Sequence, residues 1–315
     1  MNPAYTKTFR NISRHDVLSV GGKGALLGEL TRYDIPVPPG FVVCTNAFAR
    51  FLTAGDLLDR CENGFMSLRQ GSVSVERFSH ELTALILNRV MPADIEAEIR
   101  EQHTVLDAAL VAVRSSATVE DNAEHSWAGQ LESYLNVTAD GLHHAVKKCW
   151  ASLFSERALT YRLRETSGDE PVQVAVVIQA MINPEVAGIA FSVNPVTENR
   201  NEIIIEAGFG LGEAVVQGQI TPDHYVVEKY SFSVIEKFLS PQKRGIYRLE
   251  DGSTGWKPLD AGISSRQKLE DHDISKLTQM VVAIEQLVGF PCDIEWVYVN
   301  QQFYIVQCRP ITTLS

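Results

Sequence analysis

Four polar residues near the end of the sequence have types and spacing that suit a metal and phosphate site. Asp293 and Glu295 alternate with apolar residues, and Gln307 and Arg309 do the same in a second run after a short turn. Residues two apart in a strand point to the same face, so each pair shares a face. Carboxylate and amide oxygens suit Mg²⁺, and the guanidinium fork suits phosphate. The two runs therefore predict a hairpin that carries these ligands.

The register of this hairpin decides whether the polar pairs meet. A three-residue loop over 300–302 would set Glu295 opposite Gln307. The same loop would set Asp293 opposite Arg309, whereas a two-residue loop would separate the pairs. The alternative interpretation is an ordinary surface salt bridge beside an exposed amide. Regular alternation also predicts two faces: one with Phe303 and Ile305 beside Gln307 and Arg309, the other with Ile294, Trp296, Tyr304 and Val306.

The composition limits the classes of protein. The chain has 315 residues and a net charge of -11, which argues against nucleic acid or an anionic membrane surface as the main partner. Five scattered cysteines with no C-x-x-C pair indicate a reducing compartment. No signal peptide and no run of eighteen apolar residues occurs, so we expect a soluble, cytoplasmic protein.

A glycine-rich loop near the start is a second candidate for phosphate binding. Gly21, Gly22 and Gly24 surround Lys23, and an amphipathic helix is expected directly after them, over 25–33. Glycines let the backbone approach a ligand, and a helix N-terminus favours anions. The pattern does not match the Walker A loop, and a plain turn is the alternative.

Two further loops carry polar groups. Arg114 lies near the end of an expected strand over 111–115, and three hydroxyl and two carboxylate residues follow it. The arginine and the hydroxyl groups could bind phosphate, and the alternative is a capped turn. Gly208, Gly210 and Gly212 precede Glu213, but the third glycine of a dinucleotide-binding loop is missing. We interpret that segment as a tight turn that presents Glu213.

The remaining pattern interleaves helices and strands, which indicates an α/β or α+β fold with mixed sheets. A continuous apolar run over 172–179 predicts a strand buried on both faces. Expected helices span 46–52, 76–87, 94–102, 142–164 and 274–288, and other expected strands span 41–44, 132–137, 187–193 and 202–207.

Taken in order, these segments resemble the ATP-binding domain of phosphoenolpyruvate synthase, pyruvate phosphate dikinase and the rifampicin phosphotransferases. The segments that carry the resemblance are GGKGALLGEL, IPVPPGFVVCTNAF, VAVRSSATVED, WAGQLESYLNV, ASLFSERALTYR, GFGLGEAVVQGQITPDHYVV and DIEWVYVNQQFYIVQCRP. The resemblance implies an α+β, ATP-grasp-like fold in which two lobes, residues 1–180 and 181–315, close on MgATP.

The resemblance also implies roles for individual residues. Lys23 and Arg114 match phosphate-contacting residues, and Arg309 matches the group that stabilises charge in catalysis. Glu295 and Gln307 match the Mg²⁺ ligands, and Glu213 and Asp293 support them. The remaining implied ATP contacts are Gly129 and Ser133 near the phosphates, and Gln179, Ala180, Met181 and Ile182 along the adenine.

The sequence departs from the family pattern at three places. Ser133 stands where threonine is more common, and Ala180 replaces a usual basic residue. Where the family commonly has a small residue followed by Ser-Phe, this chain has His125-Ser126-Trp127. These bulkier side chains would reshape the loop over the phosphates. No histidine of this chain lies in a motif like that of the family's phosphohistidine carrier, so we expect the carrier to be elsewhere or unnecessary.

The expected function is ATP-dependent phosphotransfer by the route that yields AMP and phosphate. The acceptor would be a carrier histidine or a small molecule outside this chain. Two alternatives remain: an ATP-grasp ligase that activates a carboxylate as an acyl phosphate, and a non-catalytic module that responds to nucleotide. A ligase would release ADP, which separates the first alternative from the expected route.

Overall fold

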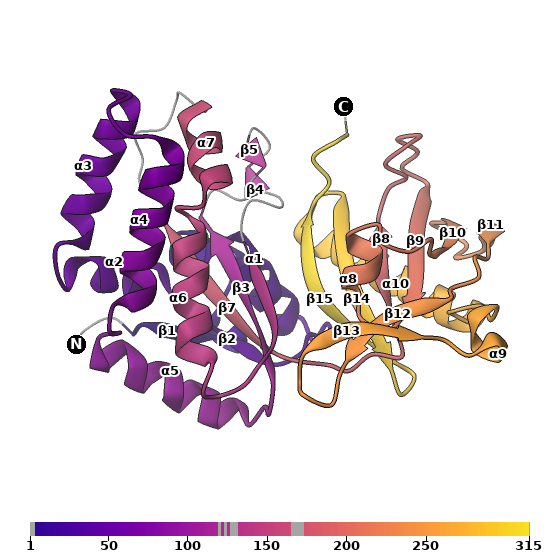
Figure 1. The fold of residues 1–315 in the computed structure, drawn as a ribbon. Helices are drawn as coiled ribbons and strands as arrows, with labels where there is room; N and C mark the ends of the chain where they lie inside the picture. Colours follow the sequence, from indigo (N-terminus) through magenta and orange to yellow (C-terminus); the bar gives the residue numbers. More distant parts are fainter. Residues whose placement is uncertain (1–3, 119–120, 123–124, 127–131, 165–172, 315) are drawn as a thin grey trace. The chain divides into compact units, whose positions relative to one another are not determined.

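The computed structural model describes residues 4–118, 121–122, 125–126, 132–164 and 173–314. The described chain forms two compact units (Figure 1). Unit 1 comprises Met1–Glu29 and Pro39–Met181, and unit 2 comprises Leu30–Pro38 and Ile182–Ser315.

Unit 1 is built on a five-stranded sheet with the order β1-β2-β7-β3-β6. All of its strand pairs are antiparallel. The central strand, β7, is almost wholly buried, as its apolar run predicts. The strands are β1 (Thr6–Thr8), β2 (Gly40–Val43), β3 (Val111–Ala117), β6 (Ser133–Val137) and β7 (Val174–Ala180), with a separate short pair β4 (Asp121–Asn122) and β5 (His125–Ser126).

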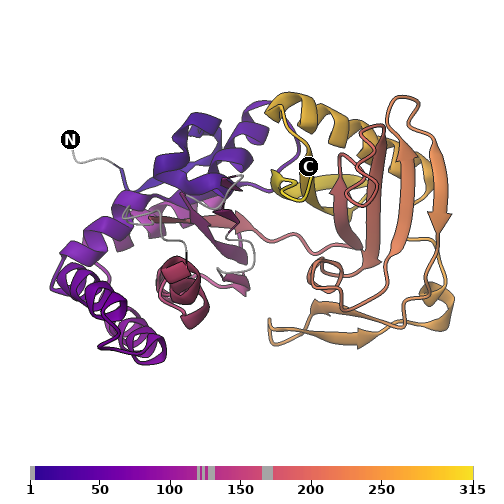
Figure 2. The same ribbon diagram turned by 90° about the horizontal axis from the view of Figure 1, so that it is seen from above.

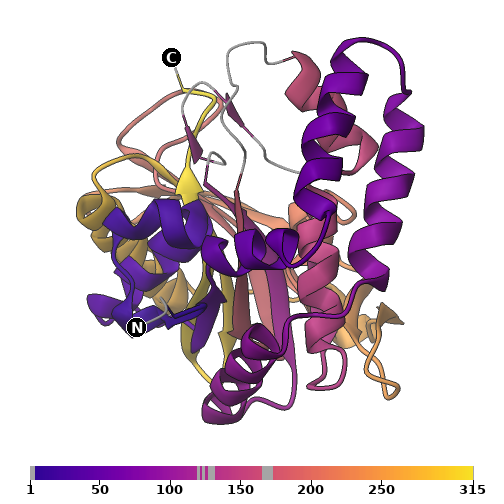
Figure 3. The ribbon, with the colours of Figure 1, turned by 90° about the vertical axis from the view of Figure 1, so that its left-hand side faces the viewer.

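Helices cover both faces of this sheet. Neighbouring serines of β3 show this, because Ser115 hydrogen-bonds to Ser152 of α6 and Ser116 hydrogen-bonds to Val20 of α1. Figure 3 shows α3 and α4 side by side. The helices are α1 (Val17–Arg32), α2 (Thr45–Thr53), α3 (Leu57–Arg69), α4 (Val75–Asn88), α5 (Ala93–Leu106), α6 (Leu142–Ser152) and α7 (Glu156–Arg164), after two short 3₁₀ turns, η1 (Phe9–Asn11) and η2 (Arg14–Asp16).

Unit 2 is built on a six-stranded antiparallel sheet with the order β11-β10-β9-β8-β14-β15. The strands are β8 (Val186–Phe191), β9 (Glu202–Phe209), β10 (Asp223–Glu228), β11 (Val234–Phe238), β14 (Cys292–Val299) and β15 (Gln302–Pro310). The expectation of mixed sheets is therefore wrong for the described strands of both units, while the α+β class is confirmed.

Two layers flank the sheet of unit 2. Helix α10 (Asp271–Val288) lies on one side and the ribbon of β12 (Arg244–Arg248) and β13 (Thr254–Pro258) on the other (Figure 2). Helix α10 packs on the face that carries Tyr298, which hydrogen-bonds to Asp273. Two short helices, α8 (Glu213–Val216) and α9 (Ala261–Ser264), complete the unit.

The closing hairpin has the expected polar pairs but not the expected loop. Strands β14 and β15 are joined by a two-residue turn, Asn300 and Gln301, whose φ angles of 49° and 62° suit a type I′ turn. One extra residue on β15, Val306, then forms a bulge, because Trp296 pairs with Ile305 and Glu295 with Gln307. The bulge restores the pairing that a two-residue turn alone would have lost.

The bulge also changes which side chains share a face. Phe303 packs against Trp296 with ring centroids 5.5 Å apart, so it lies on the apolar face and not beside Gln307. Phe303 and Ile305 are fully buried, while Tyr304 and Val306 are partly exposed. The predicted faces were wrong beyond the bulge because an extra residue inverts the alternation.

Two helical expectations also need correction. The single helix expected over 142–164 is two helices, and the Ser155 hydroxyl accepts from the Ala158 N–H to cap the second. Helix α3 was not expected. None of the described helices is long and apolar enough to cross a membrane.

Candidate functional site

Helix α1 is interrupted at the glycine-rich segment. Gly21 alone has non-helical angles, φ 70° and ψ 172°, so a second helical stretch starts directly after it. A Cβ atom at Gly21 would lie 2.2 Å from the Ser116 carbonyl oxygen, which shows how closely α1 approaches β3. This break places Lys23 in the first turn of a helical stretch, where anions are favoured.

Strand β3 holds Lys23 in place. The Lys23 ammonium donates to the Ser115 carbonyl oxygen at 3.2 Å. The Ser116 hydroxyl donates to the Val20 carbonyl oxygen and accepts from the Gly24 N–H, which bridges the helix break. The sequence suggested these serines as phosphate donors or turn caps. Both are buried and bonded inside the protein, so we interpret them as residues that position Lys23.

Arg114 and Ser133 are direct partners in the pairing of β3 with β6. Arg114 is partly exposed, and Ser133 is exposed. Arg114 lies two residues before Ser116 on the same strand, so both face α1 and Lys23. Unit 1 therefore gathers Lys23, Arg114 and Ser133 around one end of β3. Gly129 and Trp127 lie outside the described residues.

The expected adenine segment lies at the end of β7. Gln179 is buried and pairs with Ala112 of β3, two residues from Arg114. The N–H groups of Ala180 and Met181 donate to the carbonyl oxygens of Pro39 and Leu110. Adenine recognition through this segment would therefore use carbonyl oxygens or Ile182. Met181 is the last residue assigned to unit 1, and Ile182 begins the main part of unit 2.

Unit 2 carries the acidic and cationic pairs of the hairpin. Glu295 lies opposite Gln307, and Asp293 lies opposite Arg309, as predicted. Arg309 Nη2 lies 2.7 Å from Asp293 Oδ2, and Arg309 Nε donates to the same oxygen at 2.8 Å. Burial raises the pKa of Asp293, although Arg309 opposes this shift. The four side chains therefore form one compact polar site.

The donor set of the hairpin fits Mg²⁺ better than a transition metal. Among the described residues, no three His, Cys, Asp or Glu side chains are arranged to hold a metal ion. A Glu295 carboxylate and a Gln307 amide are hard oxygen donors, and Mg²⁺ is commonly held by one or two such groups together with substrate phosphates.

Glu213 begins α8 and follows the glycine segment. Gly210 has φ 89°, and a Cβ atom there would lie 2.5 Å from the Ile246 carbonyl oxygen of β12. Gln242 fixes the same passage, since its amide group accepts from the Phe209 N–H and donates to the Phe209 carbonyl oxygen. The glycines therefore allow close packing of the β12–β13 ribbon, in agreement with the tight turn that we inferred.

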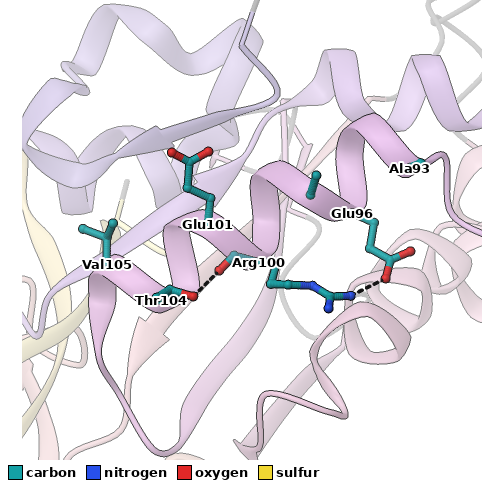
Figure 4. A pocket seen from close by; sticks show the side chains of 7 residues that line it. Ala93, Glu96, Arg100, Glu101, Thr104 and Val105 are labelled. Atoms are coloured by element: carbon teal, nitrogen blue, oxygen red, sulfur yellow. Dashed lines mark hydrogen bonds and ion pairs between the residues drawn. The ribbon is translucent and has the colours of Figure 1, made fainter.

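Two surface hollows of unit 1 lie apart from most of these residues. One of about 620 Å³ runs along α5, where Arg100 pairs with Glu96 (Figure 4), and no predicted site residue lines it. The other, of about 510 Å³, is lined by residues that include Glu132 and Tyr134, the neighbours of Ser133. The predicted site residues thus lie mostly on strand ends and helix starts and do not line these hollows.

Comparison with known proteins shows the family to which the chain belongs. The family model described as pyruvate phosphate dikinase, AMP/ATP-binding domain, matches residues 17–315. A probable phosphoenolpyruvate synthase of Methanothermobacter thermautotrophicus is 39% identical over 322 residues, which cover 99% of this chain and 46% of the relative. A probable phosphoenolpyruvate synthase of Methanocaldococcus jannaschii is 38% identical over 312 residues, which cover 96% of this chain and 26% of the relative.

A rifampicin phosphotransferase of Streptomyces sviceus is 39% identical over 315 residues, which cover 98% of this chain and 36% of the relative. The chain thus spans about a quarter to a half of the length of these curated relatives. The family match covers nearly all of the chain, and its fold is ATP-grasp-like. This chain belongs to the family of pyruvate phosphate dikinase AMP/ATP-binding domains.

Proposed function

We propose that this chain is the MgATP-binding part of a phosphotransferase. The observation that carries the proposal is the hairpin of unit 2, which aligns Glu295 with Gln307 and Asp293 with Arg309 on one face. A carboxylate and an amide oxygen for the metal, beside a guanidinium for phosphate, are the groups that phosphoryl transfer needs.

The polar group of unit 1 supports the same proposal. Lys23 and Arg114 supply two cations at one end of β3, and Ser133 supplies a hydroxyl opposite Arg114. We propose that these three side chains contact the phosphates of the nucleotide. The segment from Gln179 to Ile182 and the carboxylate of Glu213 would contact the rest of that nucleotide and its metal shell.

The proposed mechanism is positioning together with charge neutralisation. Lys23, Arg114 and Arg309 would hold the phosphate oxygens in line and offset the charge that develops on them during transfer. Glu295 and Gln307 would hold Mg²⁺, which supplies further neutralisation of phosphate charge when bound. Asp293 keeps Arg309 oriented through its ion pair. This mechanism needs no protein nucleophile within the chain.

The acceptor is the less defined part of the proposal. The names of the relatives describe phosphoenolpyruvate synthases and rifampicin phosphotransferases, whose acceptors differ. We propose that phosphate passes to a carrier histidine or a small molecule outside this chain, with AMP and phosphate as products. ADP as the nucleotide product would instead indicate the ligase type of chemistry. Nucleotide binding with no turnover beside candidate acceptors would indicate a non-catalytic module.

Nucleotide titration tests the binding part. Calorimetry with ATP should give Mg²⁺-dependent binding that Lys23→Ala and Arg309→Ala each weaken by about tenfold or more, the loss expected for one charge-assisted contact. Arg248→Ala is the matched control, because Arg248 is an exposed cation on β12. Absence of Mg²⁺-dependent binding, or unchanged affinity in both site variants, would contradict the proposal.

A further inference from the structure

The smaller hollow of unit 1, of about 510 Å³, lies among elements that carry several polar groups. Its lining comes from α4, β6, α6 and the first residues of α7, and α4 packs against both α6 and α7 (Figure 1). Sites for small molecules commonly have volumes of about 300–1,000 Å³. The hollow is therefore large enough for a small ligand.

This hollow lies on the opposite face of the unit 1 sheet from the helix break beside Lys23. Ser152 belongs to the lining and hydrogen-bonds to Ser115 of β3. The next residue, Ser116, instead hydrogen-bonds to both sides of the break in α1. Successive side chains of a strand point to opposite faces. The hollow is thus separate from the residues that we assign to the nucleotide phosphates.

Two hydroxyl groups of α4 are available to a ligand. Ser79 and Thr83 both line the hollow, and their spacing of four residues puts them on one face of the helix. Ser79 is only 7% exposed, yet neither hydroxyl forms a hydrogen bond within the described part of the chain. The Ser79 oxygen is not enclosed by protein atoms, so it opens into the hollow. Other helical hydroxyls, those of Thr53, Thr104 and Thr278, donate to the carbonyl four residues earlier.

Two cations of the lining also lack a carboxylate partner. The side chains of Lys148 and Arg157 form no ion pair or hydrogen bond with any residue that the structure describes. The Lys148 ammonium lies over the Tyr134 ring, 5.0 Å from the ring centroid. This contact holds the ammonium in place and leaves its N–H groups for an acceptor.

The start of α7 adds backbone donors on the same side. The Ser155 hydroxyl caps this nine-residue helix, because it accepts from the Ala158 N–H. The N–H groups of Glu156 and Arg157 donate to no acceptor among the described residues. Such groups in the first turn of a helix favour an anion. The hydroxyls, the cations and these N–H groups together suit a phosphate group.

Two carboxylates of the lining restrict the rest of the ligand. Glu132 and Glu156 would repel a second anionic group, but carboxylates accept readily from hydroxyl groups. Glu132 accepts from the Tyr134 hydroxyl through Oε2, and Oε1 can accept from a ligand. A compound with a phosphate at one end and hydroxyl groups at the other fits both parts of the lining.

We propose that this hollow binds a small phosphorylated polyol. Its phosphate oxygens accept from Ser79, Thr83 and Lys148 and from the N–H groups at the start of α7. Arg157, which is exposed, offsets the phosphate charge at the opening, and Glu132 accepts from the hydroxyl groups of the ligand. The site goes beyond the proposed function, because it shares no residue with the nucleotide site.

Calorimetry with glycerol 3-phosphate, inorganic phosphate and glycerol tests the site. Glycerol 3-phosphate should bind at least about threefold more tightly than inorganic phosphate, and glycerol alone should not bind. Lys148→Met should weaken binding of glycerol 3-phosphate by about tenfold, and Ser79→Ala combined with Thr83→Val should do the same. Glu132→Ala should remove the preference for the ester over inorganic phosphate.

Two further variants make the test specific. Arg77→Met is the matched control for a lost cation, since Arg77 is exposed on α4 and does not line the hollow. Lys23→Ala distinguishes the hollow from the nucleotide site. Both variants should keep the affinity for glycerol 3-phosphate within about twofold.

Three results would overturn the inference. They are no binding of either phosphate compound at millimolar concentration, unchanged affinity in the Lys148 and Ser79 variants, and equal affinity of the wild-type protein for the ester and inorganic phosphate. Failure to bind ATP, with glycerol 3-phosphate still bound, would contradict only the proposed function, so the two failures are distinguishable.

Discussion

Arg309 donates to Asp293 across the closing hairpin through two nitrogens that converge on one carboxylate oxygen, Oδ2. The carboxylate is largely buried, whereas the Arg309 side chain is 37% exposed. A buried carboxylate depends on its partner, because an unpaired charge in the interior is costly. The pair therefore links the stability of unit 2 to the residue that we assign to phosphate.

The first prediction separates these two roles of Arg309. Arg309→Met should lower the free energy of unfolding by about 1–2 kcal/mol, less than for a fully buried pair because Arg309 is partly solvated. Combining it with Asp293→Asn should recover most of that loss, since no buried charge then lacks a partner. Urea denaturation measures both changes.

The double variant should still bind ATP at least tenfold more weakly than the wild-type protein, because it lacks the guanidinium. Recovery of both stability and affinity would mean that Arg309 serves only the ion pair.

The second prediction concerns pH and Asp293. Burial, opposed by Arg309, raises the pKa of Asp293 in the folded state above its usual value. As pH rises past about 3.9, the unfolded carboxyl ionises first, so the folded state loses stability until its own higher pKa is passed. The stability of the wild-type protein relative to Asp293→Asn should therefore fall with rising pH in this acidic window. A relative stability that rises there would contradict the assigned direction.

The hairpin shows what alternation can and cannot predict. The polar residues at every second position of each strand correctly predicted that Glu295 pairs with Gln307, because this pairing puts the four polar side chains on a common face. Alternation could not reveal the bulge at Val306, which is as apolar as Ile305 before it. The positive φ angles at Asn300 and Gln301 were also hidden, since glutamine gives no strong signal for a type I′ turn.

The glycine-rich loop shows a different limit. The sequence predicted a loop over 21–24 and then a helix over 25–33, whereas α1 runs from Val17 to Arg32 and is broken at Gly21 alone. The glycines marked the break in helical conformation but not its extent. The sequence could not show that Ser116 bridges the break or that Ser115 accepts from Lys23, since those residues are over ninety positions away. Such long-range contacts follow from the packing of α1 on β3, which no local pattern encodes.

The third prediction tests that packing through a pair of glycines. Gly21 and Gly71 have φ angles of 70° and 68°, but a Cβ atom at Gly71 meets nothing within 4 Å. Gly71→Ala should cost only backbone strain, about 1 kcal/mol. Gly21→Ala adds a clash with the Ser116 backbone and should cost at least about 1 kcal/mol more in thermal or urea unfolding. Equal losses would show that α1 can move away from β3 without penalty.

The fourth prediction concerns the cysteines, which are all buried and free of disulfides. Burial raises the pKa of Cys44 to about 11 and the pKa values of Cys61 and Cys149 to about 12. A thiol reagent at pH 8 should therefore react slowly with the folded protein and rapidly with all five thiols in urea. A rapid first equivalent without urea would contradict this.

The raised thiol pKa values also set a direction for alkaline stability. Unfolded thiols ionise near pH 9, below the folded values, so the unfolded state loses these protons first. The contribution of the thiols to the free energy of unfolding should therefore decrease as the pH rises above about 8.5. Cys149→Ala, compared with the wild-type protein from pH 8 to pH 10, should show a shallower decline. An identical slope would rule out the assigned cause.

The fifth prediction concerns the most deeply buried ion pair among the described residues. Lys268 lies 2.8 Å from Asp223, and both side chains are at most 1% exposed. The same carboxylate also accepts from the Tyr225 hydroxyl and the Ser240 N–H, so it ties β10 to the chain that leads into the β12–β13 ribbon. Lys268→Met should cost about 3–5 kcal/mol, because it leaves a buried carboxylate without its cation.

Hydrogen exchange can locate this loss within unit 2. The amides of 240–268 should exchange faster in Lys268→Met, because the Asp223 anchor no longer holds that segment against the sheet. Asp223→Asn combined with Lys268→Met should recover part of the stability by removing the unpaired charge. Exchange that rises equally throughout unit 2 would instead mean that the pair supports the whole sheet and not the ribbon, since local anchoring confines the change to the segment it holds.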